Sequence, residues 1–260
     1  MRTSATLPGP GPSAINLRPS RPTLVHAGLH QNVLVRRPVG SNEVRVIGGR
    51  LGGRRLVAAQ GTTTRPTADR VREALFSRLE SRYGLSDARV LDVFAGTGAL
   101  AIEAVSRGAA GALCIESGKS ALAALRRNVS ALALERSVRV LAGDFRSALR
   151  AQAQAGATFD GVFVDAPYAK DLTRETLELL DAGALVAERG WVAAETSTRE
   201  KPLPRVGRLV LQRQDAYGDT MLLLYERSGD ATGEDARAGG IRTEAQEPQP
   251  TDVPEPKEKG

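Results

Sequence analysis

The sequence predicts an α/β fold: a doubly wound, mostly parallel sheet that helices cover on both faces. Apolar segments of strand length alternate five times with amphipathic segments of helix length between residues 86 and 228. A glycine-rich turn follows the first strand, as is typical where such a sheet passes into its first helix. The last two strand-like segments follow each other directly, so we expect a C-terminal antiparallel hairpin strand in the sheet.

A small N-terminal extension, residues 44–85, precedes this sheet. Residues 44–47 and 54–57 are typical of two short strands around a glycine-rich turn. Residues 68–82 place their apolar side chains mostly on one helical face, and Thr67 is positioned to cap the helix N-terminus. We therefore expect a β-hairpin and a helix here.

Periodicity also gives the elements of the main domain, residues 86–228. The predicted strands span residues 89–94, 112–116, 138–141, 160–165, 191–195, 206–212 and 220–226. The predicted helices span residues 98–107, 118–133, 145–154 and 172–182. Helices between successive strands allow the crossovers that parallel pairing requires.

The charge of the chain is unevenly distributed. Its 260 residues carry 36 Lys+Arg against 30 Asp+Glu, a formal net charge of +6. Residues 41–85 hold nine arginines against four acidic residues, whereas residues 86–229 are neutral. Residues 1–43 and the acidic residues 229–260 are Pro- and Gly-rich and lack apolar periodicity, which predicts two disordered tails. The basic extension indicates an anionic partner, although a codon bias toward arginine is a second interpretation.

Two scarce residue types exclude several kinds of site. One cysteine cannot form an internal disulfide, and we expect a reducing, cytoplasmic location. Both histidines, His26 and His30, lie in the N-terminal tail, so neither a histidine triad nor a His/Cys metal site is expected in the main domain. No apolar run approaches the length of about 18 residues that spans a membrane.

The turn after the first strand carries a cofactor motif. Residues 92–98 read DVFAGTG, and the segment continues as G-x-G-x-x-A into a helix. Gly96 and Gly98 let the backbone turn sharply and approach a ligand, and the helix N-terminus offers free N–H groups. Dinucleotide enzymes and S-adenosylmethionine enzymes both use this pattern, and a tight structural turn is the simplest alternative.

Acidic residues follow three successive strands. Because the carboxyl ends of parallel strands share one edge, Asp92, Glu116 and Asp144 are expected near one ligand. A carboxylate at Glu116 suits a ribose diol, and one at Asp144 suits an adenine amino group. Taken singly, Glu116 and Asp144 also fit solvated acids at strand ends.

The fourth strand of the main domain delivers Asp165 to the same edge, where Ala166, Pro167 and Tyr168 follow. Pro167 fixes its own backbone and keeps Ala166 extended. A flat tyrosine ring beside a hydrogen-bond acceptor suits a nucleobase that is stacked and held by its edge. Partial burial over the sheet is the alternative for Tyr168.

Residues 44–226 resemble the bacterial 16S ribosomal RNA guanine-N2 methyltransferases of the RsmD type. The resemblance rests on the segments RVIGG (45–49), RPT (65–67), DRVRE (69–73), LF (75–76), DVFAGTG (92–98), AL (99–100), EA (103–104), SRGA (106–109), IE (115–116) and VFVD (162–165). It implies a Rossmann-like methyltransferase sheet with S-adenosylmethionine as the cofactor and 16S RNA, in the small ribosomal subunit or its assembly intermediate, as the partner. We expect a monomer without metal.

The motifs and the resemblance together assign the site residues. The cofactor-binding candidates are Asp92, Phe94, Ala95, Gly96, Thr97, Gly98, Glu116 and Asp144. The catalytic candidates are Asp165, Ala166, Pro167 and Tyr168. The candidates for RNA phosphate contacts are Arg54, Arg55, Arg65, Arg70 and Arg72, each of which also fits a solvated face or a local ion pair. The family's usual loop is Asp-Pro-Pro-aromatic, so Ala166 is a departure that relaxes the backbone.

The chemistry expected of this site is methyl transfer to an exocyclic amine. Asp165 and the carbonyl of Ala166 would orient the amine toward the methyl group and stabilise its developing positive charge. An acceptor-only carboxylate suits the two donors of a guanine edge, whereas an amide suits adenine. The alternatives are an adenine-N6 methyltransferase of DNA or RNA, a nicotinamide-dependent oxidoreductase and a non-catalytic RNA-binding module.

Overall fold

The computed structural model describes residues 44–59, 66–167, 171–229 and 242–245. The strands are β1 (Val44–Arg45), β2 (Arg55–Leu56), β3 (Arg89–Asp92), β4 (Gly111–Glu116), β5 (Val138–Ala142), β6 (Phe159–Asp165), β7 (Val186–Ser197), β8 (Arg205–Val206), β9 (Leu209–Tyr217), β10 (Thr220–Arg227) and β11 (Arg242–Ala245). The helices are the 3₁₀ turn η1 (Gly49–Leu51) and α1 (Pro66–Arg82), α2 (Ala99–Ser106), α3 (Lys119–Ala131), α4 (Phe145–Gln154) and α5 (Leu172–Ala182).

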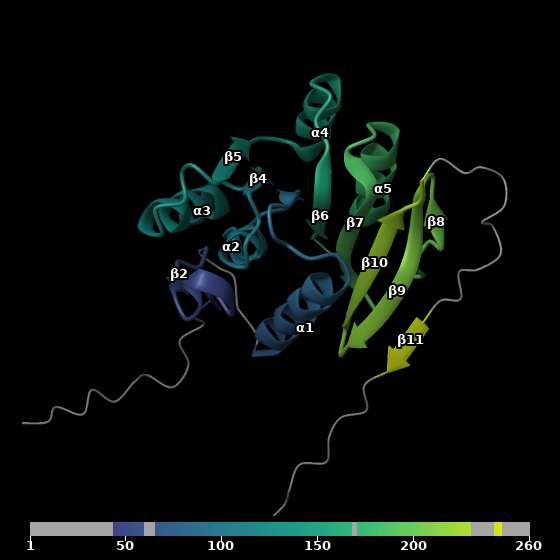
Figure 1. Cartoon of the computed structure of the whole chain (residues 1–260), viewed down its shortest axis with the longest axis horizontal. Helices are drawn as coiled ribbons and strands as arrows, with labels where there is room; N and C mark the ends of the chain where they lie inside the picture. Colours follow the sequence, from purple (N-terminus) through teal and green to yellow (C-terminus); the bar gives the residue numbers. More distant parts are fainter. Residues whose placement is uncertain (1–43, 60–65, 168–170, 230–241, 246–260) are drawn as a thin grey trace, which may run out of the picture. The chain divides into compact units, whose positions relative to one another are not determined.

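The main sheet has the strand order β11-β9-β10-β7-β6-β3-β4-β5, with β8 beside β9 (Figure 1). Strands β5, β4, β3, β6 and β7 pair in parallel, and β10 pairs antiparallel with both β7 and β9. The predicted α/β sheet with a C-terminal antiparallel hairpin strand is therefore confirmed. The chain order reverses between β3 and β6, which is where open α/β sheets bind their ligands.

Helices cover both faces of this sheet. Apolar residues of α1, α2 and α3 form one buried cluster with the sheet, and those of α4 and α5 form a second cluster on the other side (Figure 1). The fully buried ring of Phe76 on α1 lies 5.5 Å from the ring of Phe163 on β6. Tyr83, just after α1, lies 6.2 Å from Trp191 on β7. The N-terminal extension therefore shares its core with the sheet.

The hairpin of β1 and β2 is fixed to α2 by a buried carboxylate. Glu103 accepts hydrogen bonds from the N–H groups of Ile47 at 2.6 Å and Gly48 at 2.7 Å. Gly49 has φ +70°, and a Cβ there would lie 2.1 Å from the carbonyl oxygen of Ser106. The two glycines of the RVIGG segment thus allow a close approach to the C-terminal turn of α2.

Several elements differ from the sequence prediction. Strand β7 spans Val186–Ser197 and is longer than the predicted 191–195, and β3 ends at Asp92. Thr67 lies inside α1 rather than capping it, because α1 begins at Pro66, whose fixed φ suits a first helical turn. Strand β9 continues to Tyr217, so its hairpin with β10 turns within two residues. Residues 242–245, placed by prediction in a disordered tail, form β11, which pairs in parallel with the edge strand β9 and satisfies backbone groups that an edge leaves open.

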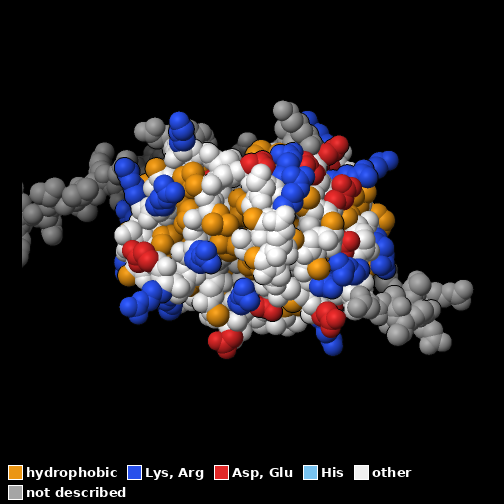
Figure 2. Space-filling view, turned by 90° about the horizontal axis from the view of Figure 1, so that it is seen from above, with side chains coloured by type: hydrophobic (Ala, Val, Ile, Leu, Met, Phe, Trp, Pro, Cys, Tyr) orange, Lys and Arg blue, Asp and Glu red, His pale blue; other side chains and the backbone are white. Residues whose placement is uncertain are grey.

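Positive and negative side chains alternate over the surface drawn in Figure 2. Lys and Arg side chains there lie beside Asp and Glu side chains rather than in a field of one sign. Within the described ranges, no helix is long and apolar enough to cross a membrane.

Candidate active site

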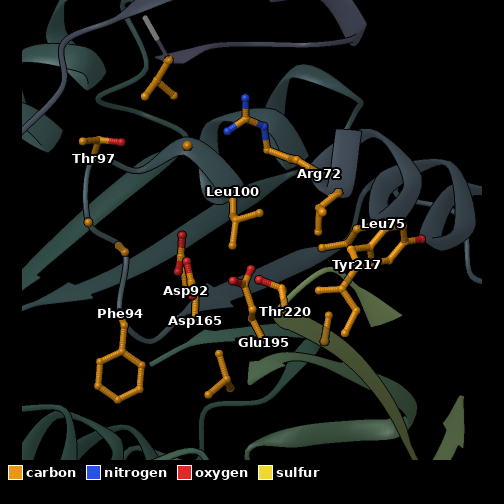
Figure 3. Close-up of a pocket in the computed structure, with 18 of the residues that line it drawn as sticks. Arg72, Leu75, Asp92, Phe94, Thr97, Leu100, Asp165, Glu195, Tyr217 and Thr220 are labelled. Carbon is orange, nitrogen blue, oxygen red and sulfur yellow. The ribbon is translucent and has the colours of Figure 1, made fainter. Parts of the chain in front are cut away.

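A cavity of about 670 Å³ opens at the carboxyl edge of the parallel strands. Its walls come from the turn after β3 (residues 94–100), from α1 and from the turn between β9 and β10 (residues 217–220) (Figure 3). Val44 and Ala59 of the N-terminal extension also line it. The cavity therefore lies at the reversal of chain order, and the extension completes its wall.

Carboxylates from three neighbouring strands converge in this cavity. Asp92 ends β3, Asp165 ends β6, and Glu195 lies on β7 directly opposite Asp165 in the strand register. Figure 3 shows these side chains together at the centre of the site. Sequence reasoning proposed Asp92 and Asp165 but missed Glu195, although the apolar segment 191–194 before it had the same pattern that singled out the other acids.

Because these acidic side chains lie close together, the site favours either protonation of the carboxylates or the binding of a positively charged ligand. Asp92 is buried, and its Oδ2 accepts a 3.3 Å hydrogen bond from the N–H of Ala101. Burial, followed by the negative charges of Asp165 and Glu116, raises the pKa of Asp92 to about 8. Burial and the charge of Glu195 raise the pKa of Asp165 to about 7, although Asp165 keeps surface exposed to the cavity.

The residues present fit S-adenosylmethionine, which carries a positive sulfonium and a positive amino group. Oδ1 of Asp92 is buried and has no hydrogen-bond partner within the described residues, so it can receive a donor or a cation from a ligand. No group of three or more His, Cys, Asp or Glu side chains in the described ranges is arranged to hold a metal ion.

The glycine-rich loop has the backbone that the sequence predicts. Gly96 and Gly98 have φ +55° and +82°, in the left-handed region that favours glycine. A Cβ at Gly98 would lie 2.3 Å from a methyl group of Leu125, whereas a Cβ at Gly96 would have open space apart from Phe94 O at 4.0 Å. Phe94, Ala95, Gly96 and Thr97 line the cavity, whereas Gly98 is not part of its described wall. That these residues bind the cofactor stays a prediction.

Glu116 supports the loop from β4. Its Oε2 accepts the N–H of Gly96 at 2.8 Å, and its Oε1 accepts the N–H groups of Ser117 and Gly118 at 2.8 and 2.6 Å. A carboxylate offers about four acceptor positions, so capacity on Oε2 remains for a ribose hydroxyl. Glu116 does not itself line the cavity, and its ribose contact stays a prediction.

Asp144 has a local structural role. It is the N-cap of α4, and its Oδ1 accepts the N–H groups of Arg146 at 3.0 Å and Ser147 at 3.2 Å. Its Oδ2 lies 3.3 Å from the Arg146 guanidinium. Asp144 is absent from the described cavity wall, and nothing in this arrangement supports the predicted contact with adenine.

The loop after Asp165 is only partly described. Ala166 is buried against the α4–α5 side of the sheet, and Pro167 is exposed. Tyr168 lies outside the described residues, so its predicted stacking on a base remains a prediction. The structure instead brings Tyr217, which sequence reasoning did not consider, to the cavity wall opposite the glycine loop (Figure 3).

The predicted phosphate-binding arginines fall into two groups. Arg54, Arg55 and Arg70 are exposed, whereas Arg65 lies outside the described residues. Arg72 is buried at the cavity wall, where it donates to Asp69 at 2.9 Å and to the carbonyl of Arg45 at 2.8 Å. This ion pair is the local alternative that the sequence left open, and it keeps Arg72 off the outer surface.

A buried amide links the extension to the cofactor loop. Asn128 on α3 accepts the N–H of Val57 at 2.7 Å and donates to the carbonyls of Val57 at 3.1 Å and Thr97 at 2.9 Å. No sequence signal distinguished Asn128, because its partners are 71 and 31 residues away.

Known proteins resemble this chain over the same region. The family model described as "Conserved hypothetical protein 95" matches residues 44–226. A "Putative rRNA methyltransferase YlbH" of Bacillus subtilis is 37% identical over 187 residues, which cover 72% of this chain and 100% of that protein. A "Ribosomal RNA small subunit methyltransferase D" of Escherichia coli K12 is 38% identical over 196 residues, or 75% and 94% of the two chains.

Solved structures agree with these relatives. The structure titled "Putative methyltransferase yhhF from Escherichia coli" has a TM-score of 0.64 and 38% identity, and the match covers 72% of this chain and 99% of that one. A Thermus thermophilus protein titled as hypothetical has a TM-score of 0.61 and 32% identity, with 70% and 98% covered. Because the family model spans the extension, the glycine loop and the acidic edge of the sheet, the chain belongs to the Conserved hypothetical protein 95 family, the RsmD-type methyltransferases that its motifs resemble.

Proposed function

We propose that this protein is an S-adenosylmethionine-dependent methyltransferase that methylates the exocyclic N2 amine of a guanine in small-subunit ribosomal RNA. The main support is that one cavity is lined both by the glycine loop and by Asp165 and Glu195. The names of its relatives, a ribosomal RNA small subunit methyltransferase D among them, support the substrate class. The alternative, a nicotinamide-dependent oxidoreductase, gives no chemical role to Asp165 and Glu195 in the cavity.

In this proposal, one set of residues binds the cofactor and another binds the target base. When bound, S-adenosylmethionine supplies a methyl group already activated by its sulfonium charge. The glycine loop and Asp92 hold and orient the cofactor, and Glu116 receives its ribose. Asp165 accepts a hydrogen bond from the target amine, which turns the nitrogen lone pair toward the methyl group.

Acceptor chemistry favours guanine over adenine. Asp165 and Glu195 lie opposite each other in register, so two carboxylates face the base side of the cavity. A guanine edge presents N1–H and the N2 amine, which are both donors, whereas an adenine edge pairs a donor with an acceptor. Two carboxylates can therefore accept both hydrogen bonds from a guanine edge, whereas an adenine edge would leave its acceptor without a donor.

The setting of the reaction is part of the same proposal. We infer that the substrate is 16S RNA within a small-subunit particle or its assembly intermediate, approached by the exposed arginines of the extension, and that the enzyme acts as a cytoplasmic monomer without metal. Support for the RNA partner comes from the basic balance of residues 41–85.

The test is nucleoside analysis of small-subunit RNA after incubation with the full-length protein and S-adenosylmethionine carrying a deuterated methyl group. We expect labelled N2-methylguanosine; labelled N6-methyladenosine, or binding of NAD in preference to S-adenosylmethionine by calorimetry, would contradict the proposal. Asp165→Ala should abolish labelling while cofactor affinity stays nearly unchanged. Asp160→Asn, at the other end of β6, is the control and should keep activity.

A further inference from the structure

We propose that Asp165 and Glu195 work as a carboxylate pair that removes the proton from the target amine, with Asp165 as the acceptor and Glu195 as the residue that positions and tunes it. The inference rests on the proposed function, because it concerns the same site. Glu195 was not singled out by the sequence, and it lines the same cavity as Asp165.

The pairing follows from strand register. Asp165 on β6 is the direct neighbour of Glu195 on β7, and in-register neighbours of adjacent parallel strands project to the same face about 5 Å apart. Both residues line the cavity, and Figure 3 shows their carboxyl groups beside each other and beside Asp92. The pair is therefore built into the sheet rather than carried by a loop.

Among the described residues, the elements around the pair supply little positive charge. Asp92 faces it from β3, and Asp219 lines the cavity from the turn between β9 and β10. The glycine loop and the part of α3 at the wall contribute no charged side chain to the described lining. Arg72 of α1 is the cation of that lining, and its guanidinium is engaged by Asp69 and by the carbonyl of Arg45.

Such a pair holds a proton near neutral pH. Two close carboxylates ionise in separate steps, because the second negative charge is repelled by the first. Burial and Glu195 together raise the pKa of Asp165 to about 7. A base with this proton affinity is matched to proton transfer at physiological pH, whereas an ordinary aspartate is too weak.

The chemistry requires a proton acceptor of this kind. Transfer forms an N–C bond at the amine and breaks an N–H bond, while the methyl group's C–S bond breaks and its electron pair stays on sulfur. The positive charge that leaves sulfur must depart as the amine proton. Asp165 accepts this proton and becomes a neutral acid, and its surface toward the cavity lets it return the proton to water.

The experiment measures kcat/KM for the RNA, at saturating S-adenosylmethionine, against pH for the full-length wild type, Glu195→Gln, Glu195→Asp and Glu188→Gln. Glu188 is an exposed glutamate on the same strand, so its variant is a matched control for loss of one charge. Activity should rise with pH as Asp165 loses its proton. Glu195→Gln should move this rise about one pH unit lower and reduce the plateau several-fold, because Asp165 becomes a weaker base.

Glu195→Asp keeps the charge and should retain a pH profile close to that of the wild type, and Glu188→Gln should match the wild type. A second readout is the titration of the Asp165 carboxyl carbon by NMR in the protein alone, where Glu195→Gln should lower its midpoint. An unchanged midpoint and an unchanged pH profile in Glu195→Gln would overturn the inference.

The two proposals fail separately. If the wild type makes no N2-methylguanosine, the proposed function is wrong, and the NMR titration still reports whether the pair is coupled. If labelled guanine forms but Glu195→Gln behaves as Glu188→Gln does, the function stands and the carboxylate pair does not. Cofactor affinity by calorimetry checks that each variant is folded.

Discussion

Removal of the Glu103 carboxylate tests how the N-terminal hairpin is held on α2. Glu103 has no exposed surface, and it accepts hydrogen bonds from Ile47 N and Gly48 N at 2.6 and 2.7 Å and from Arg107 Nε at 2.7 Å. Glu103→Ala leaves these donors without their acceptor, and breaking a buried ionic network costs about 3–5 kcal/mol. We expect a loss near 3 kcal/mol, because Arg107 keeps its 2.8 Å ion pair with Glu80.

Urea unfolding measures this loss. The fluorescence of Trp191, the single tryptophan, reports on the contact between β7 and the α1 region. Glu80→Ala is the matched control, since it removes a 42% exposed partner of the same arginine and should cost at most about 1 kcal/mol. Equal free energies of unfolding for Glu103→Ala and Glu80→Ala would refute the reasoning. Tryptic cleavage within residues 45–55 should also accelerate in Glu103→Ala alone.

The remaining predictions concern the cofactor and the RNA. Because the pKa of Asp92 is raised to about 8, Asp92 is largely protonated at pH 6 and must release its proton to pair with a cationic ligand. As the pH rises toward 8, the affinity for S-adenosylmethionine, measured by calorimetry, should therefore increase by up to about tenfold per pH unit, and above pH 8 it should level off. The Asp92→Asn variant should show no such dependence on pH. Gly98→Ala, with φ +82° and a Cβ 2.3 Å from a leucine methyl group, should weaken cofactor binding. Gly53→Ala, which has a similar φ of +80° but open space, should spare it. Replacing both Arg54 and Arg55 by Ala should lower the slope of log affinity for RNA against log salt by about 1.5, measured by fluorescence anisotropy; an unchanged slope would show that neither contacts phosphate.

Local features of the sequence predicted most of the fold. Helix α4 begins and ends where periodicity placed it, at Phe145 and Gln154, and the glycine loop has the left-handed backbone that Gly96 and Gly98 permit. These features depend on neighbours within a few residues, so they can be read from the chain itself. Thr67 was misplaced as a cap because Pro66 starts the helix, a competition between two local signals.

The site was predicted less completely, because some side chains have local partners that compete with the predicted ligand contacts. Asp144 satisfied the strand-end pattern, yet the start of α4 uses its carboxylate as a cap. Arg72 belonged to a basic segment, yet it turns inward to Asp69. In both cases the sequence allowed either interpretation, and only the folded structure shows which partner each side chain takes.

By itself, the sequence determined an α/β sheet, a cofactor loop between the first strand and helix of the main domain, and acids at the ends of the strands that carry Asp92 and Asp165. The tertiary structure decided which acids meet. The order β7-β6-β3 places Glu195 beside Asp165 and Asp165 near Asp92, although 30 or more residues of chain separate each from the next. Hydrogen bonding between strands distant in sequence sets that order, so the shared charge of the site, and the raised pKa values it causes, exist only in the folded sheet.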